Sequence, residues 1–334
     1  MTVQNLSGTQ RAGQRLMIGF DGLSMTETLK QYIEQFKVGG LILFARNIDS
    51  PAQVQDLCAQ AQACALQCGQ PPLLIAIDQE GGVVSRLKPP FTQFAGNPHM
   101  KSTDDAVRFA LTTAQELGQI GVNMNMAPVL DVLPTDGPSV MQARAFGHDP
   151  KHVARMGTAV IHHMQMKKIM AVAKHFPGIG RTVLDSHEDL PDLDLDAGLL
   201  ADTDMIPFQA AVAADVAGMM LSHIRYRDLD PKWPASLSPV IAEKILRQRL
   251  AFNGLVVTDD LDMGAIAKHY ALPVIVEQCL NASVDILLIC HAGPKIKAAL
   301  DQIFALRKDN ETLIRKEEES LQRILRAKEA YLGA

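Results

Sequence analysis

The chain has 334 residues, of which 47% are hydrophobic and 21% are charged, with a formal net charge of −5. This size suffices for one large domain with a substantial core, while the acidic balance and the aromatic content of only 5% argue against a nucleic-acid-binding surface. No apolar stretch approaches the roughly 18 residues that would span a bilayer, so we expect a cytoplasmic protein without membrane contact.

Short apolar runs alternate along the chain with longer segments of helical character. This alternation predicts an α/β fold, specifically a (β/α)8 barrel of the TIM type, regular or slightly irregular. A charged segment with regularly spaced leucines at 310–331 predicts a closing amphipathic helix. Because no linker or internal repeat is visible, we expect residues 1–334 to form a single domain, with no second domain after the barrel. The eight expected strands are 16–20, 41–44, 73–77, 123–129, 170–173, 218–222, 255–258 and 284–289.

Ionisable residues follow the apolar run at 73–77. Asp78 comes directly after the run, and Arg86 lies beyond a glycine turn. Barrels place their chemistry at the carboxyl ends of strands. An arginine there can also direct two donors onto adjacent oxygens of a ligand. The alternative is an ion pair between Asp78 and Arg86 that bridges the loop and contacts no ligand.

A second ionisable group follows the run at 170–173, where Lys174 and His175 fall at the strand end. Proline and glycines at 177–180 then predict a mobile loop. Along an extended segment residues two apart face the same way, so Asp185 could hold the His187 imidazole as an oriented acid/base. Chance, or an Asp that caps the next helix, would give the same spacing. A mobile loop need not keep His187 at the site in every state.

A third acidic group ends the β-branched run at 256–258. Asp259 is the first carboxylate after it, and Asp260 and Asp262 follow. An acid at this point is either a nucleophile at the barrel mouth or the N-cap of a helix that begins near Met263.

The segment 174–187 resembles the signature of family 3 glycoside hydrolases: Lys-His-Phe-Pro-Gly-Ile-Gly, four further residues, then Asp-Ser-His. The similarity is to the single-domain β-N-acetylglucosaminidases of the NagZ type, and it extends from about Gly19 to the last strand. It implies a TIM-type barrel, and no cofactor is expected.

The resemblance also implies roles for individual residues. Asp259 corresponds to the nucleophile and His187 to the general acid/base, with Asp185 as its partner, while Asp260 and Asp262 are left as capping or supporting acids. Asp131 is interpreted as another supporting acid. The residues implied to bind the sugar are Asp78, Arg86, Arg144, Lys174 and His175.

Two positions depart from the family pattern. Ile179 stands where the family usually has His, and we expect altered packing of the loop or altered contact with the aglycone, with the chemistry kept. Val83 stands where the family often has Arg, which removes a charge near Asp78 and affects the expected substrate range.

The resulting prediction is a retaining exo-β-N-acetylglucosaminidase. By resemblance its substrate is GlcNAc linked to anhydro-N-acetylmuramic acid or its peptides, from cell-wall recycling. The expected partner is this small carbohydrate or muropeptide; no nucleic acid or membrane is expected, and the sequence indicates no oligomeric state. The alternatives are a related β-glycosidase or phosphorylase acting on another β-glycoside, and a sugar-binding regulator without turnover.

The five cysteines are odd in number and lack metal-ligand spacing, which predicts reduced thiols. Cys64 and Cys68, four apart in an Ala/Gln-rich helical stretch, are interpreted as small residues on a helix face. His291, just past the last strand, is interpreted as a satisfied loop residue and not as a substrate contact, and no metal site is predicted.

Overall fold

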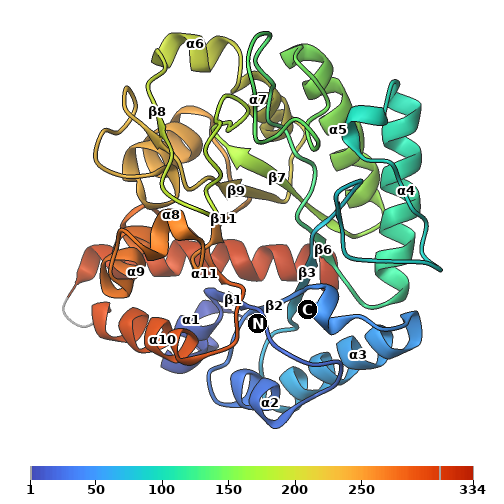
Figure 1. The fold of residues 1–334 in the computed structure, drawn as a ribbon. Coiled ribbons are helices and arrows are strands. Elements are labelled where there is room, and N and C mark those ends of the chain that lie inside the picture. The colour runs from blue at the N-terminus through green and yellow to red at the C-terminus, as the bar shows by residue number, and fades with distance from the viewer. Residues whose placement is uncertain (1, 308–309, 334) are drawn as a thin grey trace.

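The computed structural model describes residues 2–307 and 310–333, and its centre is a closed barrel of eight parallel strands (Figure 1). Each of the eight predicted runs overlaps one barrel strand, so the predicted TIM-type barrel is confirmed, although β7 and β11 extend beyond the predicted ends. The run at 123–129 forms a two-residue strand and, beyond Pro128, an isolated parallel bridge between Val129 and Lys174. In order around the barrel, the strands are β1 (Leu16–Ile18), β2 (Gly40–Leu43), β3 (Leu74–Ile77), β6 (Met124–Asn125), β7 (Met170–Phe176), β9 (Gly218–Leu221), β11 (Leu255–Asp260) and β12 (Ile286–Ile289).

Helices surround this barrel, and most begin at a local sequence signal (Figure 1). Ser50 and Ser102 cap the third and fourth helices through their hydroxyls, and Asp149 caps the fifth. The α-helices are α1 (Gly8–Gly13), α2 (Glu27–Glu34), α3 (Pro51–Gln67), α4 (Thr103–Gln119), α5 (Pro150–Met166), α6 (Ala197–Asp202), α7 (Ile206–Ala213), α8 (Gly264–Ala267), α9 (Leu272–Asn281), α10 (Pro294–Leu306) and α11 (Glu311–Leu332), with a π-helix at Val240–Arg249.

Two small strand pairs lie outside the barrel: β4 (Gln79–Gly81) pairs antiparallel with β5 (Val84–Ser85), and β8 (Asp192–Leu193) pairs parallel with β10 (Arg225–Tyr226). Short 3-10 turns occupy Val3–Asn5, Ala45–Asn47, Asn97–His99 and Ala235–Leu237. None of the helices within the described ranges has the length and apolar character needed to cross a membrane.

Side chains alternate along each barrel strand between the barrel interior and the surrounding helices. The residues that pack together inside the barrel are every second one, for example Leu74 and Ala76 on β3, Val172 on β7, and Leu255 and Val257 on β11. Their sequence neighbours belong to the larger cluster between strands and helices. Two faces are therefore buried, which explains why these runs are apolar throughout.

Helix α11, predicted over 310–331, contributes to the interior cluster. Its buried Leu321 and Ile324 pack in the same cluster as Met17, Ile42 and Leu74 of the barrel strands. The side chains of α11 therefore cover the apolar interior at the end of the barrel from which the strands start.

Candidate active site

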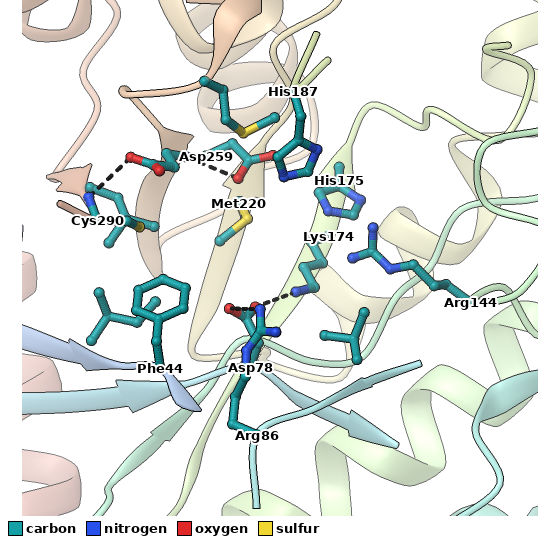
Figure 2. Close-up of a pocket in the computed structure, with 15 residues that line it drawn as sticks. Phe44, Asp78, Arg86, Arg144, Lys174, His175, His187, Met220, Asp259 and Cys290 are labelled. Atoms are coloured by element: carbon teal, nitrogen blue, oxygen red, sulfur yellow. Dashed lines mark hydrogen bonds and ion pairs between the residues drawn. The ribbon is translucent and has the colours of Figure 1, made fainter. Parts of the chain in front are cut away.

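A cavity of about 230 Å³ opens at the carboxyl ends of the barrel strands (Figure 2). The period of two explains its floor: Asp78, Lys174 and Asp259 each stand two residues after an inward-facing apolar residue of their strand, so they form the next layer above the core. The cavity is lined by Ile42, Phe44, Asp78, Val84, Arg86, Arg144, Lys174, His175, His187, Met220, Asp259, Asp260, Met263, Leu288 and Cys290.

The Lys174 ammonium lies between two carboxylates on one side of the cavity. Its Nζ is 2.7 Å from Asp78 Oδ1 and 2.7 Å from Glu80 Oε1. Arg86 Nη2 approaches Asp78 Oδ2 at 3.5 Å. Burial alone would raise the pKa of Asp78, but Lys174 and Arg86 outweigh it and hold the pKa at about 2. The Asp78–Arg86 ion pair that the sequence suggested is present, and both of its residues also line the cavity.

Glu80 is a member of this charge network that the sequence analysis did not single out. Its two oxygens accept hydrogen bonds from Arg144 Nε at 3.0 Å and Nη2 at 2.7 Å, a bidentate contact. Glu80 is 98% buried at the side chain, so it holds Arg144 and Lys174 without lining the cavity itself. Its position two residues after Asp78, on the same side of an extended segment, was the available signal.

Asp131 fixes the second residue of the Lys-His pair. Its Oδ2 is 2.8 Å from His175 Nδ1, and its Oδ1 accepts the backbone N–H groups of His175 and Ile179. Since Asp131 is fully buried and His175 lines the cavity, the carboxylate sets the orientation of the imidazole. This is the supporting position that the sequence analysis expected for Asp131.

Asp259 is the second-to-last residue of β11 and faces the same cavity (Figure 2). Burial raises the pKa of its carboxyl, but the nearby His175 and the backbone N–H of Asp260, 2.9 Å from Asp259 Oδ1, outweigh burial and lower the pKa below its usual value. The carboxylate is therefore ionised at neutral pH. Helix α8 has Met263 as its N-cap with no side-chain hydrogen bond, so the helix-cap interpretation of Asp259 is wrong.

His223 is a second buried group that the sequence analysis passed over. Its Nε2 is 2.9 Å from the carbonyl of Asp260 and its Nδ1 is 2.7 Å from Ser236 Oγ. A carbonyl only accepts, so Nε2 carries the proton and Nδ1 accepts from the Ser236 hydroxyl. Burial lowers the pKa of His223, which favours this neutral form. The hydrogen bond from Nε2 to the Asp260 carbonyl then fixes the end of β11 beside Asp259. The place of His223 two residues after β9, at the carboxyl end of a barrel strand, is the sequence feature that could have identified it.

The two acids after Asp259 tie β11 to the segment after β12. Asp260 Oδ1 accepts the backbone N–H groups of Asp262 and Cys290, each at 3.0 Å. Asp262 binds Lys295 Nζ at 2.7 Å and the backbone N–H of His291 at 3.1 Å. Neither acid caps α8. Of the capping and supporting roles expected for Asp260 and Asp262, the structure therefore shows the supporting role. His291 pairs with Asp262 and does not line the cavity.

Asp185 and His187 form the expected pair, with Asp185 Oδ1 2.7 Å from His187 Nδ1 (Figure 2 shows His187 beside Asp259). The expected extended backbone is wrong. The segment turns, because the N–H groups of Glu188 and Asp189 donate to the Asp185 carbonyl and the His187 N–H donates to Asp185 Oδ1. His187 is 69% exposed at the side chain but lines the cavity, with Nε2 left for a ligand.

The loop that carries His187 rests directly on the backbone of helix α8. The N–H groups of Gly264 and Ala265 donate to the carbonyls of His187 and Ser186, at 3.2 and 3.1 Å. Lys268 Nζ donates to the carbonyl of Glu188 at 2.6 Å. A Cβ at Gly264 would lie 2.7 Å from the carbonyl oxygen of His187 and closer still to that of Glu188, so only glycine permits this approach.

The predicted mobile loop divides into two parts. Residues 177–180 are buried, and Ile179 belongs to the main core cluster, where its N–H donates to Asp131. The expectation of mobility is therefore wrong for this part, and Ile179 does not line the cavity. Residues 183–185 are exposed. Val83 is 70% exposed, next to the cavity-lining Val84.

Comparison with known proteins gives a consistent set of relatives. The model of the glycosyl hydrolase family 3 N terminal domain matches residues 9–327. The beta-hexosaminidase of Thiobacillus denitrificans is 36% identical over 285 residues, 83% of this chain and 78% of that protein. Beta-hexosaminidase A of Pseudoalteromonas piscicida is 33% identical over 320 residues, 85% of this chain and 54% of that protein.

Among solved structures, a glycoside hydrolase family 3 beta-N-acetylglucosaminidase from a Paenibacillus species superposes with a TM-score of 0.94 and 36% identity. The match covers 98% of this chain and 63% of that one. The chain therefore spans only part of the length of this protein and of the Pseudoalteromonas relative.

Replacing Gly264 by Ala should displace the loop that carries His187, because the added methyl group collides with two loop carbonyls. Overpacking of this kind costs about 1–3 kcal/mol, a roughly 5- to 150-fold change in the local opening equilibrium. In the Gly264→Ala variant, hydrogen exchange at the amides of Ala265 and Glu188 should accelerate accordingly. Gly118→Ala, where a Cβ meets nothing within 4 Å, is the matched control. Unchanged exchange at these amides in Gly264→Ala would show that the close approach at Gly264 does not hold the loop.

Proposed function

This chain belongs to glycosyl hydrolase family 3, and we propose that it is a retaining exo-β-N-acetylglucosaminidase with Asp259 as nucleophile and His187 as general acid/base. The observation that supports the proposal most is that a partly buried, ionised carboxylate and an exposed, carboxylate-paired imidazole line one cavity. A displacement with retention needs both a nucleophile and a proton donor at the glycosidic bond.

In the first proposed step, Asp259 attacks the anomeric carbon while the glycosidic C–O bond breaks. His187, as imidazolium, donates its Nε2 proton to the departing oxygen, and Asp185 keeps the ring oriented through Nδ1. The lowered pKa of Asp259 suits this assignment, since a nucleophile must be ionised at the pH at which the donor is protonated.

In the second proposed step, the glycosyl-Asp259 ester is hydrolysed. His187, now neutral, takes a proton from water as the water oxygen bonds to the anomeric carbon, and the C–O bond to Asp259 breaks. The histidine returns to its protonated form and the sugar leaves with its configuration retained. The exposure of His187 agrees with access of water at this stage.

We assign recognition of the sugar to Asp78, Arg86, Arg144, Lys174 and His175. All five line the cavity, and they offer charged donors and acceptors to hydroxyl groups at fixed positions. Glu80 and Asp131 act as positioning residues in this proposal, because they contact Arg144, Lys174 and His175 from outside the cavity.

The choice of N-acetylglucosamine rests on the relatives, several of which are named beta-hexosaminidases or beta-N-acetylglucosaminidases. The cavity of about 230 Å³ lies below the usual range of about 300–1,000 Å³ for ligand sites, which favours a single terminal sugar over an internal one. We further propose that the aglycone is anhydro-N-acetylmuramic acid or its peptides, that the protein acts in the cytoplasm in cell-wall recycling, and that residues 1–334 work as one barrel domain.

Nitrophenyl glycosides that differ only in the 2-acetamido group test the proposed activity. We expect turnover of the β-N-acetylglucosaminide and much slower turnover of the β-glucoside, with free sugar as product. Adding inorganic phosphate should not change the product. Equal rates on both glycosides would argue for a broader β-glycosidase, and formation of a sugar phosphate would identify a phosphorylase.

Asp259→Ala should lower turnover by at least about 10⁴-fold, as expected when the nucleophile is lost, while binding of the sugar stays measurable. A 2-fluoro or 5-fluoro glycoside should label Asp259 covalently in the unmodified protein, and peptide mapping locates the label. Asp262→Asn is a matched control, since that carboxylate pairs with Lys295 outside the cavity. A label on Asp260 or Asp262 would refute the assignment.

His187→Ala should slow glycosides with poor leaving groups by about 10²- to 10⁴-fold, the usual contribution of a general acid. Nitrophenyl glycosides should lose far less in the first step, because their leaving group needs no proton. The ratio of the two kcat/KM values, measured for both proteins, reports this difference. Equal losses on both substrates, or none, would leave the Asp185–His187 pair with only a structural function.

A further inference from the structure

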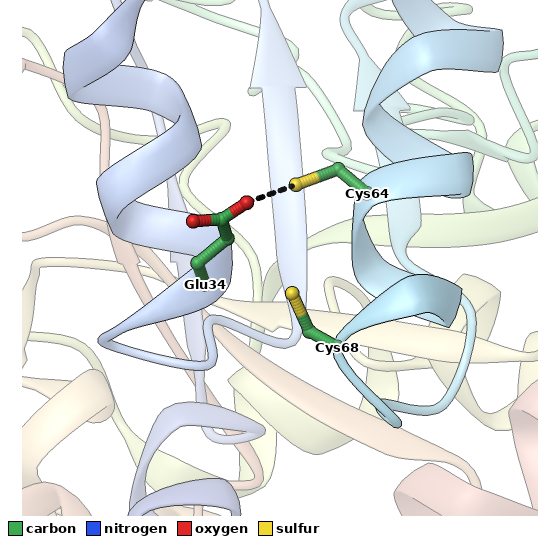
Figure 3. A group of neighbouring side chains, drawn as sticks. All are labelled: Glu34, Cys64 and Cys68. Atoms are coloured by element: carbon green, nitrogen blue, oxygen red, sulfur yellow. Dashed lines mark hydrogen bonds between the residues drawn. The ribbon is translucent and has the colours of Figure 1, made fainter.

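Helices α2 and α3 bring together three potential metal ligands. Both helices are remote in sequence from the loops that carry the proposed catalytic residues. The carboxylate oxygen of Glu34 and the sulfurs of Cys64 and Cys68 all lie within 4.8 Å of one another (Figure 3). From the sequence alone, Cys64 and Cys68 are two residues on one helix face, because the third ligand, Glu34, comes from a different helix.

The chemistry of this cluster suits a thiophilic cation. Cys64 and Cys68 stand four residues apart at the end of α3, so their thiols share one face of the helix. Cys64 Sγ already donates to Glu34 Oε1 at 3.7 Å. Two cysteine sulfurs and one carboxylate are ligands that zinc accepts. Glu34 and Cys68 are only partly buried, which leaves them room to adjust and leaves a cation a path of entry.

The local electrostatics also favour a cation. Glu34 is the last residue of α2 and Cys68 is the C-cap of α3, so two helix C-termini, each with a partial negative charge, flank the cluster. An acid at a helix C-terminus is unfavourable on its own, and the interaction that the described residues give the Glu34 carboxylate is the one with Cys64 Sγ at 3.7 Å. The nearby Lys37 directs its Nζ to the carbonyl of Cys68, at 3.1 Å.

A second group of potential ligands consists of Asp260, Asp262 and His291. It differs in that its ligand oxygens already have partners. There the Lys295 ammonium already binds Asp262 at 2.7 Å, and backbone N–H groups occupy Asp260 Oδ1. In the cluster of Glu34, Cys64 and Cys68, by contrast, the described contact of the neighbouring Lys37 ammonium is with the Cys68 carbonyl and not with any of the three potential ligand atoms.

We propose that Glu34, Cys64 and Cys68 bind a divalent cation of the zinc class, with water as the fourth ligand. The cation would join α2 to the end of α3. Binding must displace the thiol protons, so it releases protons and tightens as the pH rises. Burial, together with the neighbouring Cys68 and Glu34, raises the pKa of Cys64 to about 11, so the metal has to compete with a firmly held proton.

The experiment uses the full chain, reduced and stripped of metal with a chelator. Cadmium serves as the optical probe, since cadmium bound to thiolates gives an ultraviolet charge-transfer band, and zinc affinity is measured by competition with a chromophoric chelator. We expect one equivalent of cadmium to produce the band and zinc to raise the unfolding temperature, because the cation binds the folded state.

Cys68→Ser should abolish the band and the thermal shift, and weaken zinc by at least about tenfold, the loss seen even for residues around a metal that do not ligate it. Because Cys68 is half-buried at a helix end, this variant should fold. Glu34→Gln should weaken zinc while a cadmium–thiolate band remains. Cys58→Ala, on the same helix but outside the cluster, is the matched control and should keep every signal. Absence of the band in the unmodified protein, or its persistence in Cys68→Ser, would overturn the proposal.

Discussion

The register of the barrel strands is the constraint on which the candidate site depends. Because side chains alternate with a period of two, the residues that follow Ala76, Val172 and Val257 at a distance of two must also point inward. These residues are Asp78, Lys174 and Asp259. A slip of one residue in any strand would send its charged group into the apolar layer beneath the helices. Packing of the apolar core therefore also places the charges of the cavity.

The charges placed in this way neutralise one another before any ligand binds. Lys174 lies between Asp78 and Glu80, and Glu80 in turn holds Arg144 through two hydrogen bonds. Removing one member would leave its partners buried with uncompensated charge, which is strongly unfavourable. The network therefore keeps the groups assigned to sugar binding at fixed positions, and a ligand need not supply the energy to order them.

The sequence was sufficient to predict what depends on neighbours along the chain. The strands, and the charged residues at the ends of three of them, follow from apolar runs and from the rule that barrels place chemistry at strand ends. Glu80 and His223 were missed because their roles come from contacts with Arg144 and with the Asp260 carbonyl, which are 64 and 37 residues away in sequence. The Asp185–His187 pair was predicted from an extended backbone, yet a turn forms it. Likewise, glycines at 178 and 180 indicated mobility, whereas tertiary contacts bury that part of the loop.

The two groups assigned to bond cleavage are held in different ways, and the proposed reaction gives a reason. Asp259 is partly buried near the end of a barrel strand, where a fixed position serves the single bond that it forms and releases. His187 must serve a leaving group in one step and water in the next, so it needs both a defined orientation and an open approach. Asp185 provides the orientation, while the exposed loop provides the approach. The backbone contact at Gly264 limits how far that loop can open, since main-chain hydrogen bonds join the loop to α8 there, in addition to the Lys268 side chain at the end of that helix.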